Sequence, residues 1–438
     1  MDKSHPSSGA VPQPPEKSKG KPQTLKCPAC GGIVTIKAVG ITVSAICAYC
    51  SSFIDVANEN YQIIKKAHEK IRETLLELGV RGRLFGVEWE VIGYTEKRDG
   101  NWSWDEYLLY NPYYGFRFLV ENQGHWNFIK VLRKDIPGIG DANEIWLSGK
   151  KYQLFLKGKA LVDYVKGEFY WRVKKGECPR VADYVAPPSM LSMEENDEEI
   201  IVSLGEYLEP EEVAAAFKLK EMPRKKGVAS NQSAPYQGAF FKLWIIAVAF
   251  IVLATMVQKT ASKVADNAYV FSSQFKIDFA DQDKTISTPS FVIPKKSNVL
   301  IQSSASLDND WLELRLSLVN EQTNKEYDIV QAMEYYHGYD SDGAWSEGSP
   351  YTKVFISSVP MGNYRALIDV DAGAFIKRLP ANFSVSIQRD VPAGSNYWII
   401  ILLILLYPAL VSVRRWSFEN QRWSESDYAP GIYKTGNE

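Results

Sequence analysis

The 438-residue sequence has little of what catalytic and nucleic-acid-binding sites are usually made from. It contains four histidines and five cysteines, so few side chains can serve as nucleophiles or metal ligands. Its 50 basic and 52 acidic residues give a formal net charge of −2, which argues against nucleic-acid binding through a general cationic surface. It also lacks a G-x-S-x-G elbow, an H-E-x-x-H motif, a P-loop and a G-x-G-x-x-G before a helix. We therefore expect a protein that is not an enzyme.

The first residues contain no apolar run of the kind found in a secretory signal. Residues 1–24 are rich in Pro, Ser, Gly and Lys and cannot bury apolar area, so they are expected to form a disordered tail. The remainder can bury a core, because the hydrophobic set makes up 45% of the sequence. Aromatic residues reach 13%, an excess typical of β-rich structure, membrane interfaces or binding surfaces.

The strongest motif is a pair of C-x-x-C sequences. Cys27 and Cys30 form the first, Cys47 and Cys50 form the second, and sixteen residues separate them. Four converging thiolates close a tetrahedral structural Zn²⁺ site, so we predict a zinc ribbon over residues 25–55, called the ribbon below. A redox dithiol and disulfides are the alternatives. Docking of a protein partner fits this ribbon better than nucleic acid does. The fifth cysteine, Cys178, stands alone and is expected to be inert.

Three segments follow the ribbon. Residues 58–79 carry apolar residues at three- and four-residue steps and are predicted to form an amphipathic helix. Residues 80–220, called the β-domain below, show short β-type runs separated by turn signals, one of which is Lys166-Gly167. They predict an antiparallel meander or small barrel, closed by a helix from Pro210. Residues 221–238 are basic and polar and indicate a linker.

Two apolar stretches indicate membrane-spanning helices. Residues 239–257 and 397–413 are each about 26–28 Å long at 1.5 Å per residue, close to the thickness of a bilayer core. The segment between them, residues 258–396, alternates apolar and polar residues and predicts an antiparallel β-sandwich. Residues 414–438 are expected to form a cytoplasmic tail. Buried helices of a soluble domain are the alternative to membrane spans.

Both termini are expected to be cytoplasmic. Seven Lys or Arg residues flank the outer ends of the two spans, against five on the side of the loop. All five cysteines precede the first span, and free thiolate sites belong in a reducing compartment. The expected arrangement is a helical hairpin that displays the β-sandwich on the outer side of the membrane.

A set of motifs in the β-domain resembles a known family. The motifs are Gly79, Gly82, Gly86 and Trp89–Tyr94, then Trp104–Tyr110, Gly115–Glu121 and Gly124–Trp126, and later Gly167–Trp171, Pro187-Pro188 and Leu191-Ser192. Together they resemble the bacterial family called domain of unknown function 4178, over roughly residues 75–220. That family has no established activity. The resemblance implies an envelope-associated accessory role rather than a reaction.

Acidic and aromatic residues recur side by side in the same region. Carboxylates beside Trp and Tyr suit organic cations, through ion pairing and cation–π contacts. The candidate cation-binding residues, with a polyamine as candidate ligand, are Trp104, Asp105, Glu106, Glu168, Tyr170 and Trp171. The alternative is that the aromatic residues are cross-strand core and the acids alternate toward solvent. His125 beside Trp126 is either a general base or a packed strand histidine.

Two further acidic segments stand out. Residues 194–199 are mostly acidic and indicate either a solvated loop or a docking patch for a basic partner. Residues 335–349 combine Tyr, Trp and acidic side chains, and their carboxylates are oxygen ligands of the kind that Ca²⁺ takes. Because the segment lacks full EF-hand spacing, a structural turn is the favoured interpretation.

The sequence thus predicts a multidomain, mainly β membrane protein. Its elements are a zinc ribbon, an antiparallel β-domain and two transmembrane helices that flank an extracytoplasmic β-sandwich. We expect a non-enzymatic scaffold or sensor in envelope or membrane-stress maintenance, whose cytoplasmic modules recruit protein partners. The alternatives are a membrane-anchored organic-cation (polyamine) binding module and an uncharacterised enzyme. Homo-oligomerisation through the two spans is a further expectation.

Overall fold

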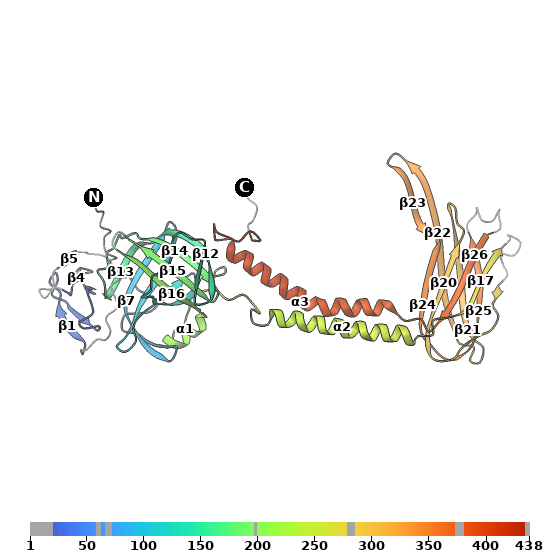
Figure 1. Cartoon of the computed structure of the whole chain (residues 1–438), viewed down its shortest axis with the longest axis horizontal. Coiled ribbons are helices and arrows are strands. Elements are labelled where there is room, and N and C mark those ends of the chain that lie inside the picture. Colours follow the sequence, from blue (N-terminus) through green and yellow to red (C-terminus); the bar gives the residue numbers. More distant parts are fainter. Residues whose placement is uncertain are drawn as a thin grey trace, which may run out of the picture. The chain divides into compact units, whose positions relative to one another are not determined.

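A computed structural model describes residues 21–57, 63–65, 72–196, 199–277, 285–372 and 381–433 (Figure 1). The chain divides into two compact units. The first contains residues 1–239 together with 411–438, and the second contains residues 240–410. Each unit is described by itself below.

The ribbon contains short strands on both sides of its cysteine pairs. Its strands and the one that follows are β1 (Gln23–Lys26), β2 (Ile33–Ile36), β3 (Ser44–Ile46), β4 (Phe53–Asp55) and β5 (Ile63–Lys65). β1 pairs with β2, and β3, β4 and β5 pair in sequence order. β2 and β3 lie between the two cysteine pairs, and β3 begins only at Ser44 because Thr42 N–H donates to the carbonyl of Ala38 and closes a turn there.

The β-domain is built from antiparallel neighbours, as predicted. Its strands are β6 (Arg81–Leu84), β7 (Val87–Asp99), β8 (Trp102–Asn111), β9 (Gly115–Asn122), β10 (His125–Val131), β11 (Glu144–Leu147), β12 (Lys150–Lys159), β13 (Leu161–Phe169), β14 (Arg180–Ala186), β15 (Ser189–Glu195) and β16 (Ile200–Leu208). Their order is β11-β12-β14-β15-β16-β10-β9-β8-β7-β13, with β6 on β7, and β13 continues the same sheet into β3-β4-β5.

The turn expected at Lys166-Gly167 is wrong, because β13 runs straight through it. Up to Gly167 this strand pairs with β7, and from Glu168 it pairs with β3 of the ribbon. Gly167 has φ +95°, and a Cβ atom there would lie 2.2 Å from the carbonyl oxygen of Ile92. Glycine is therefore needed at the point where the strand changes partner. The ribbon and the β-domain consequently share one sheet.

The helix predicted over residues 58–79 is not found where the structure describes this segment. Residues 63–65 form β5, while residues 58–62 and 66–71 lie outside the described residues. Residues 72–79 follow turns, and Leu76 is fully buried in the core of the β-domain. Leu78 packs against the same core, whereas Leu75 is exposed, so contacts with the sheet override the local helical periodicity in this segment.

The predicted closing helix is confirmed as α1 (Pro210–Phe217). Pro210 occupies its first turn, and Glu211 and Glu212 face the positive end of the helix dipole. Its buried Phe217 lies against β6 so closely that a Cβ atom at Gly82 would come within 2.5 Å of the ring. The helix thus covers one face of the sheet.

Residues 221–238 were expected to be a linker, but they are fastened to the β-domain. Asn231 is fully buried, and its amide donates to Asn127 Oδ1 at 2.7 Å and to the carbonyl of Pro188 at 3.0 Å. Lys226 N–H donates to the carbonyl of Gln123 at 3.0 Å. Polar composition predicted exposure here, whereas specific side-chain hydrogen bonds hold this segment in place.

Two long helices carry the apolar stretches. These are α2 (Phe240–Val264) and α3 (Gly394–Trp423), with mean hydropathies of 2.4 and 2.1 in their most apolar windows. Both are long and apolar enough to cross a membrane, and only 6% and 11% of those windows are buried. Thr255 and Tyr397 join the two helices through a hydroxyl–hydroxyl contact of 3.0 Å.

The C-terminal end of α3 belongs to the first unit and is anchored there. Arg422 is 1% exposed and donates to the carbonyls of Ser230 at 2.6 Å and Ala229 at 3.3 Å. Trp423 packs on Phe155 of β12 with ring centroids 5.5 Å apart. The start of the segment expected to be a cytoplasmic tail is therefore held on the β-domain.

The second unit also contains antiparallel sheets. One has the order β17-β26-β20-β24 and the other has the order β18-β25-β21-β22-β23, with β19 on β25. The strands are β17 (Ala268–Ile277), β18 (Ile286–Ser287), β19 (Phe291–Ile293), β20 (Ser297–Ala305), β21 (Asp310–Asn320), β22 (Glu326–Asp340), β23 (Gly343–Ser349), β24 (Tyr351–Val359), β25 (Gly362–Ala372) and β26 (Ala381–Arg389). Buried residues of both sheets, among them Ile301, Leu314 and Val385, form one core.

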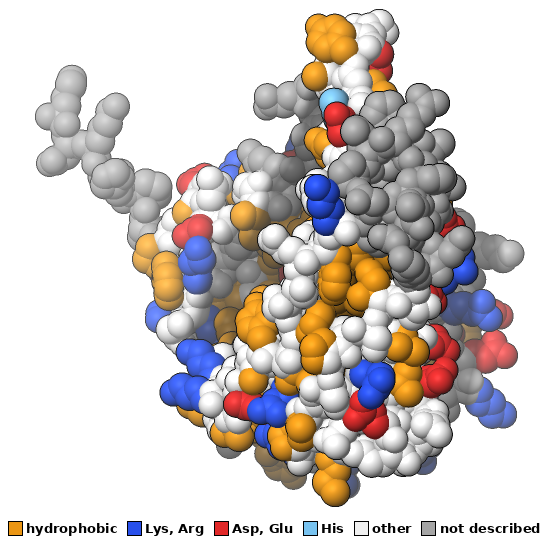
Figure 2. Space-filling model, turned by 90° about the vertical axis from the view of Figure 1, so that its right-hand side faces the viewer, with side chains coloured by type: hydrophobic (Ala, Val, Ile, Leu, Met, Phe, Trp, Pro, Cys, Tyr) orange, Lys and Arg blue, Asp and Glu red, His pale blue; other side chains and the backbone are white. Residues whose placement is uncertain are grey.

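The aromatic–acidic segment 335–349 is a projecting hairpin. From His337 to Asp340, β22 pairs only with β23, because β21 ends opposite Tyr335. Tyr339 is 84% exposed, and Nε2 of His337 lies 2.7 Å from Asp308 Oδ1, within hydrogen-bond distance. Figure 2 shows hydrophobic and acidic side chains together on the part that projects upward.

Candidate metal centre and aromatic–acidic residues

The four predicted cysteines converge in space. Their Sγ atoms all lie within 4.8 Å of one another, with Cys27 and Cys50 3.8 Å apart and Cys30 and Cys47 3.6 Å apart. Four thiolates about 2.3 Å from one tetrahedral ion would be separated by about 3.8 Å. The arrangement can therefore hold a single metal ion.

The two C-x-x-C turns have the same backbone geometry. Gly31 N–H donates to the carbonyl of Cys27, and Ser51 N–H donates to that of Cys47, at 2.8 and 2.9 Å. Gly31 and Ser51 both have positive φ, +74° and +55°. Each knuckle therefore ends in a left-handed residue, which is unstrained for glycine and uncommon for a serine such as Ser51.

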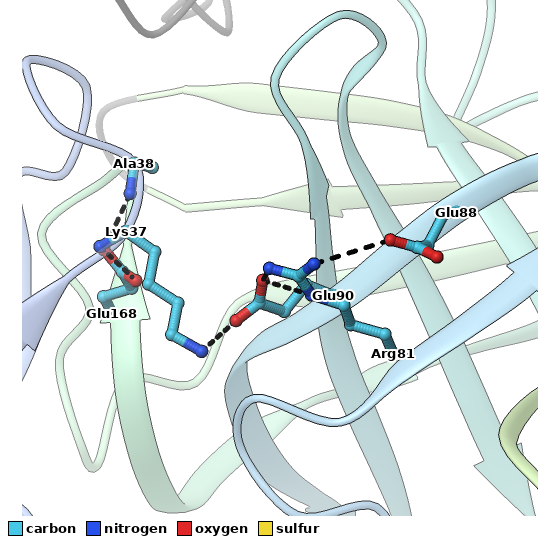
Figure 3. A network of polar contacts seen from close by, with 6 residues as sticks. All are labelled: Lys37, Ala38, Arg81, Glu88, Glu90 and Glu168. Carbon is cyan, nitrogen blue, oxygen red and sulfur yellow. Dashed lines mark hydrogen bonds and ion pairs between the residues drawn. The ribbon is translucent and has the colours of Figure 1, made fainter. Parts of the chain in front are cut away.

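The ribbon is attached to the β-domain through a buried carboxylate. Glu168, 4% exposed, accepts hydrogen bonds from Lys37 N–H at 2.9 and 3.0 Å, from Ala38 N–H at 3.3 Å and from the Thr42 hydroxyl at 2.8 Å. Figure 3 shows this carboxylate pointing at the ribbon backbone. Burial raises the pKa of Glu168, while these donors act in the opposite direction. Glu168 therefore fixes the loop that leads from β2 to β3.

Ion pairs also join the loop between β2 and β3 to the β-domain. The Lys37 ammonium forms an ion pair with Glu90 of β7, which also accepts from Arg81 of β6 at 2.8 Å. Glu88 contacts the same guanidinium at 3.6 Å and is mostly exposed. The Lys37–Glu90 pair is partly buried and adds to the Glu168 contacts, whereas the exposed Arg81–Glu88 pair contributes little.

The six candidate cation-binding residues do not form one site. Asp105 lies on one face of β8, while Trp104 and Glu106 lie on the opposite face, since side chains alternate along a strand. Glu168 is engaged with the ribbon. Tyr170 and Trp171 pack on each other at 4.7 Å, and Tyr170 packs on Phe116 at 4.5 Å.

Glu106 is already paired with a cation that the sequence analysis missed. Lys97 of β7 is 7% exposed, and its ammonium lies 3.1 Å from Glu106 and 2.6 Å from Glu194. The Trp104 indole N–H donates to Glu106 at 2.8 Å. The two carboxylates raise the pKa of Lys97 against the effect of burial. Glu194 is 97 residues away in sequence, so no local signal could reveal this pair.

Asp183 of β14 lies close to the same charges. Burial, reinforced by Glu194 and Glu106, raises the pKa of Asp183 to about 6, although Ser192 and Lys97 act in the opposite direction. Its Oδ1 atom is buried and has no hydrogen-bond partner in the described part of the chain. The Asp183 carboxyl therefore keeps its proton at pH values at which an ordinary aspartate has lost it.

His125 occupies a packed position. It is 4% exposed, with Nδ1 3.0 Å from the Tyr207 hydroxyl and Nε2 3.1 Å from the carbonyl of Lys226. Burial lowers the pKa of His125. Both ring nitrogens are engaged, which fits the interpretation as a hydrogen-bonded strand histidine.

Comparison with known proteins adds a family but no activity. Residues 77–210 match the model of the family described as Domain of unknown function (DUF4178), which confirms the resemblance of the β-domain. No curated protein matches the chain.

Solved structures resemble the chain only weakly. The C-terminal domain of A223, a structural protein of Sulfolobus turreted icosahedral virus, is 12% identical with a TM-score of 0.16, over 29% of this chain and all of that one. A protein from Sulfurospirillum deleyianum is 8% identical with a TM-score of 0.16, over 26% of this chain and 96% of that one. An infectious bursal disease virus structure is 9% identical with a TM-score of 0.17, over 80% and 64%. Likenesses of this size carry no argument about function.

Replacing Glu168 with alanine should loosen the ribbon. The variant leaves the N–H groups of Lys37 and Ala38 without their acceptor, so we expect a loss of about 1–3 kcal/mol in the free energy of unfolding. Hydrogen exchange of residues 37–46 should accelerate, while Glu88→Ala, an exposed neighbour, serves as the control and leaves it unchanged. Unaltered exchange in Glu168→Ala would show that the carboxylate does not hold the ribbon.

Replacing Asp183 with asparagine should change how stability depends on pH. Between the ordinary Asp pKa of 3.8 and about 6, native Asp183 retains a proton that the unfolded chain has released, so its contribution to stability falls as pH rises. We expect Asp183→Asn to be more stable than the parent at pH 7, by about 1–3 kcal/mol, and this gain to vanish near pH 4. Urea unfolding across this range measures the difference. The exposed Asp135→Asn serves as the control, and a gain independent of pH would contradict the assignment.

Proposed function

We propose that this chain is a two-span scaffold or sensor of the bacterial inner membrane, with the ribbon and the β-domain in the cytoplasm. The observation that carries the proposal is that α3, an exposed apolar helix of membrane-spanning length, ends in a buried Arg422–Trp423 anchor on the β-domain. A helix fastened in this way can pass a change of position to the domain that holds it. A free tail could not do so.

The proposed mechanism needs two arrangements of the hairpin with different affinities for an external ligand. The second unit would act as the external module, and its antiparallel sheets, which share one core, are consistent with a β-sandwich. Its projecting hairpin offers exposed aromatic and acidic side chains for contact with a partner. The ribbon and the β-domain would recruit proteins in envelope or membrane-stress maintenance, without an enzymatic reaction.

The cysteine arrangement supports both the location and the metal. All five cysteines are free thiols of the first unit, and the sequence has none between residues 240 and 410. Four thiolates without an oxygen or nitrogen ligand suit a closed structural zinc site. The four cysteine side chains would hold Zn²⁺ and contribute its binding free energy to the folding of the ribbon.

Metal analysis tests the zinc assignment. The purified full chain should contain one zinc ion, and Cys47→Ser should lose it, because three thiolates leave the tetrahedron open. Chelation should increase hydrogen exchange in β3 and at Lys37 while β8 stays protected, since only the ribbon depends on the metal. Cys178→Ser is the matched control and should retain zinc. Visible absorption typical of an iron–sulfur cluster would contradict the zinc assignment. A disulfide between Cys27 and Cys30 would contradict it as well.

Cysteine labelling tests the two-sided arrangement. Cys178 is exposed and reports on the first unit, and Ser341→Cys at the tip of the projecting hairpin reports on the second. In intact inner membranes, a membrane-impermeant maleimide should label the cysteine of Ser341→Cys. It should label Cys178 only after lysis. The Cys178→Ser variant identifies the labelled thiol. Labelling of Cys178 before lysis, or of position 341 only after it, would overturn the proposal.

A further inference from the structure

Two hairpin turns of the β-domain lie side by side and expose aromatic side chains. The turn between β6 and β7 contains Phe85, and the loop between β8 and β9 contains Tyr113 and Tyr114, of which Tyr113 is 79% exposed. The Asn111 side-chain amide donates to the carbonyl of Glu88 at 2.8 Å and so joins the two hairpins. Neighbouring exposed aromatic side chains are typical of interaction surfaces, since contact between large apolar groups and water is unfavourable.

Both turns have a defined conformation. Oδ1 of Asn111 accepts hydrogen bonds from Tyr113 N–H at 2.8 Å and from Tyr114 N–H at 3.1 Å. In the other turn, Phe85 has φ +51° and Gly86 has φ +77°. Such a turn favours Asn-Gly, and a left-handed backbone is uncommon for an aromatic residue. An exposed phenylalanine in an unfavourable backbone conformation is characteristic of a functional position.

A half-buried arginine lies among the same aromatic groups. The guanidinium carbon of Arg117 is 5.4 Å from the centroid of the Trp89 ring. That ring packs on Tyr114 at 6.5 Å and on Phe128 at 5.7 Å, and Phe128 packs on Phe85 at 5.1 Å. These contacts make one continuous surface over the buried ring of Trp89. This surface, called the aromatic–arginine patch below, consists of Phe85, Tyr113, Tyr114, Arg117 and Phe128.

The positive charge of Arg117 has no carboxylate partner among the described residues. Its guanidinium donates to backbone carbonyls, that of Phe116 at 2.6 Å and that of Tyr114 at 3.3 Å. Burial lowers the pKa of Arg117, and no carboxylate of the described chain counteracts this effect. Arg81, by contrast, pairs with Glu90 at 2.8 Å. A partly buried cation without a counter-ion is unfavourable, so the patch is suited to receive a negative charge from outside.

The surroundings of the patch favour a peptide carboxylate over a nucleic acid. Glu88, in the same hairpin as Phe85, is mostly exposed and would repel a polymer that carries many negative charges. The formal net charge of −2 acts in the same direction. The exposed rings suit apolar side chains instead, and Tyr, Trp and Arg are the residues that dominate binding energy in protein–protein interfaces. The combination fits one carboxylate flanked by apolar groups.

We propose that the aromatic–arginine patch binds a segment of a partner protein in which an aspartate or glutamate stands next to aliphatic side chains. The carboxylate pairs with the guanidinium of Arg117, and the aliphatic side chains cover Phe85 and Tyr113. The inference rests on the proposed function, because it specifies which surface of the β-domain recruits a protein and which chemistry that protein presents.

Selection from a library of random short peptides displayed on phage tests the chemistry, with the full chain in detergent as the target. Peptides that combine Asp or Glu with Leu, Ile or Val should be enriched. A synthetic copy of an enriched peptide should bind saturably, and its Asp→Asn or Glu→Gln counterpart should bind about tenfold more weakly, as expected for loss of a charged hydrogen bond. Absence of enrichment, or enrichment of peptides without an acidic residue, would overturn the proposal.

Variants of the chain locate the peptide. Arg117→Gln should weaken binding about tenfold or more, and Tyr113→Ser, which removes an exposed ring, about two- to tenfold. Arg83→Gln is the matched control. It removes an exposed positive charge from the same hairpin as Phe85, but its cross-strand partner is Glu88, so it lies on the opposite face from Trp89 and should leave binding unchanged. Equal weakening by Arg83→Gln would show general charge attraction and overturn the assignment to the patch.

Phe85→Asn separates binding from a structural role. It creates the favoured Asn-Gly turn, which offsets loss of the contact with Phe128, so the variant should unfold at the same temperature as the parent or higher while its peptide binding weakens. A lower unfolding temperature with unchanged peptide binding would show that the patch is structural. Peptide binding in detergent does not depend on sidedness. Failure of binding together with the expected cysteine labelling would therefore reject this surface and leave the scaffold-or-sensor proposal standing.

Discussion

The first unit depends on a single strand that serves two partners. β13 pairs with β7 up to Gly167 and with β3 from Glu168 onward, so the ribbon continues the sheet of the β-domain. The constraint is steric at the crossing point, where only glycine fits, and electrostatic one residue later, where a buried carboxylate receives the ribbon's backbone N–H groups. A metal ion in the ribbon would therefore stabilise an edge of the sheet as well as a local loop.

The carboxylates on the two faces of β8 are stabilised in different ways. On one face, Glu106 is neutralised by the buried ammonium of Lys97. On the other face, Asp105 accepts a hydrogen bond from the Tyr94 hydroxyl, and Glu121 accepts one from Gly124 N–H. A buried charge must be paired or its pKa must shift, so an ion pair stabilises the first face, whereas burial raises the pKa of both carboxylates on the second. Alternation along one strand thus separates a buried ion pair from a row of partly buried carboxylates.

The anchor at the end of α3 depends on one buried arginine. Arg422 satisfies backbone carbonyls of residues 229–232, a segment that is itself fixed by Asn231. An arginine that is almost fully buried and bonded to several carbonyls is costly to withdraw. The end of α3 and the residues that precede α2 are therefore held on the β-domain together.

Sequence alone determined the features that local pattern controls. The C-x-x-C spacing predicted the convergence of four thiols, sustained apolar runs predicted α2 and α3, and alternating runs predicted most strands of both units. Tertiary structure decided the rest. It turned part of the expected helix into β5, extended β13 through an expected turn, and divided six aromatic and acidic residues among separate environments. The placement of the acidic residues depends on partners 97 to 131 residues away, such as Lys97 with Glu194 and Lys37 with Glu168, because a charge is stabilised by the groups that folding brings to it.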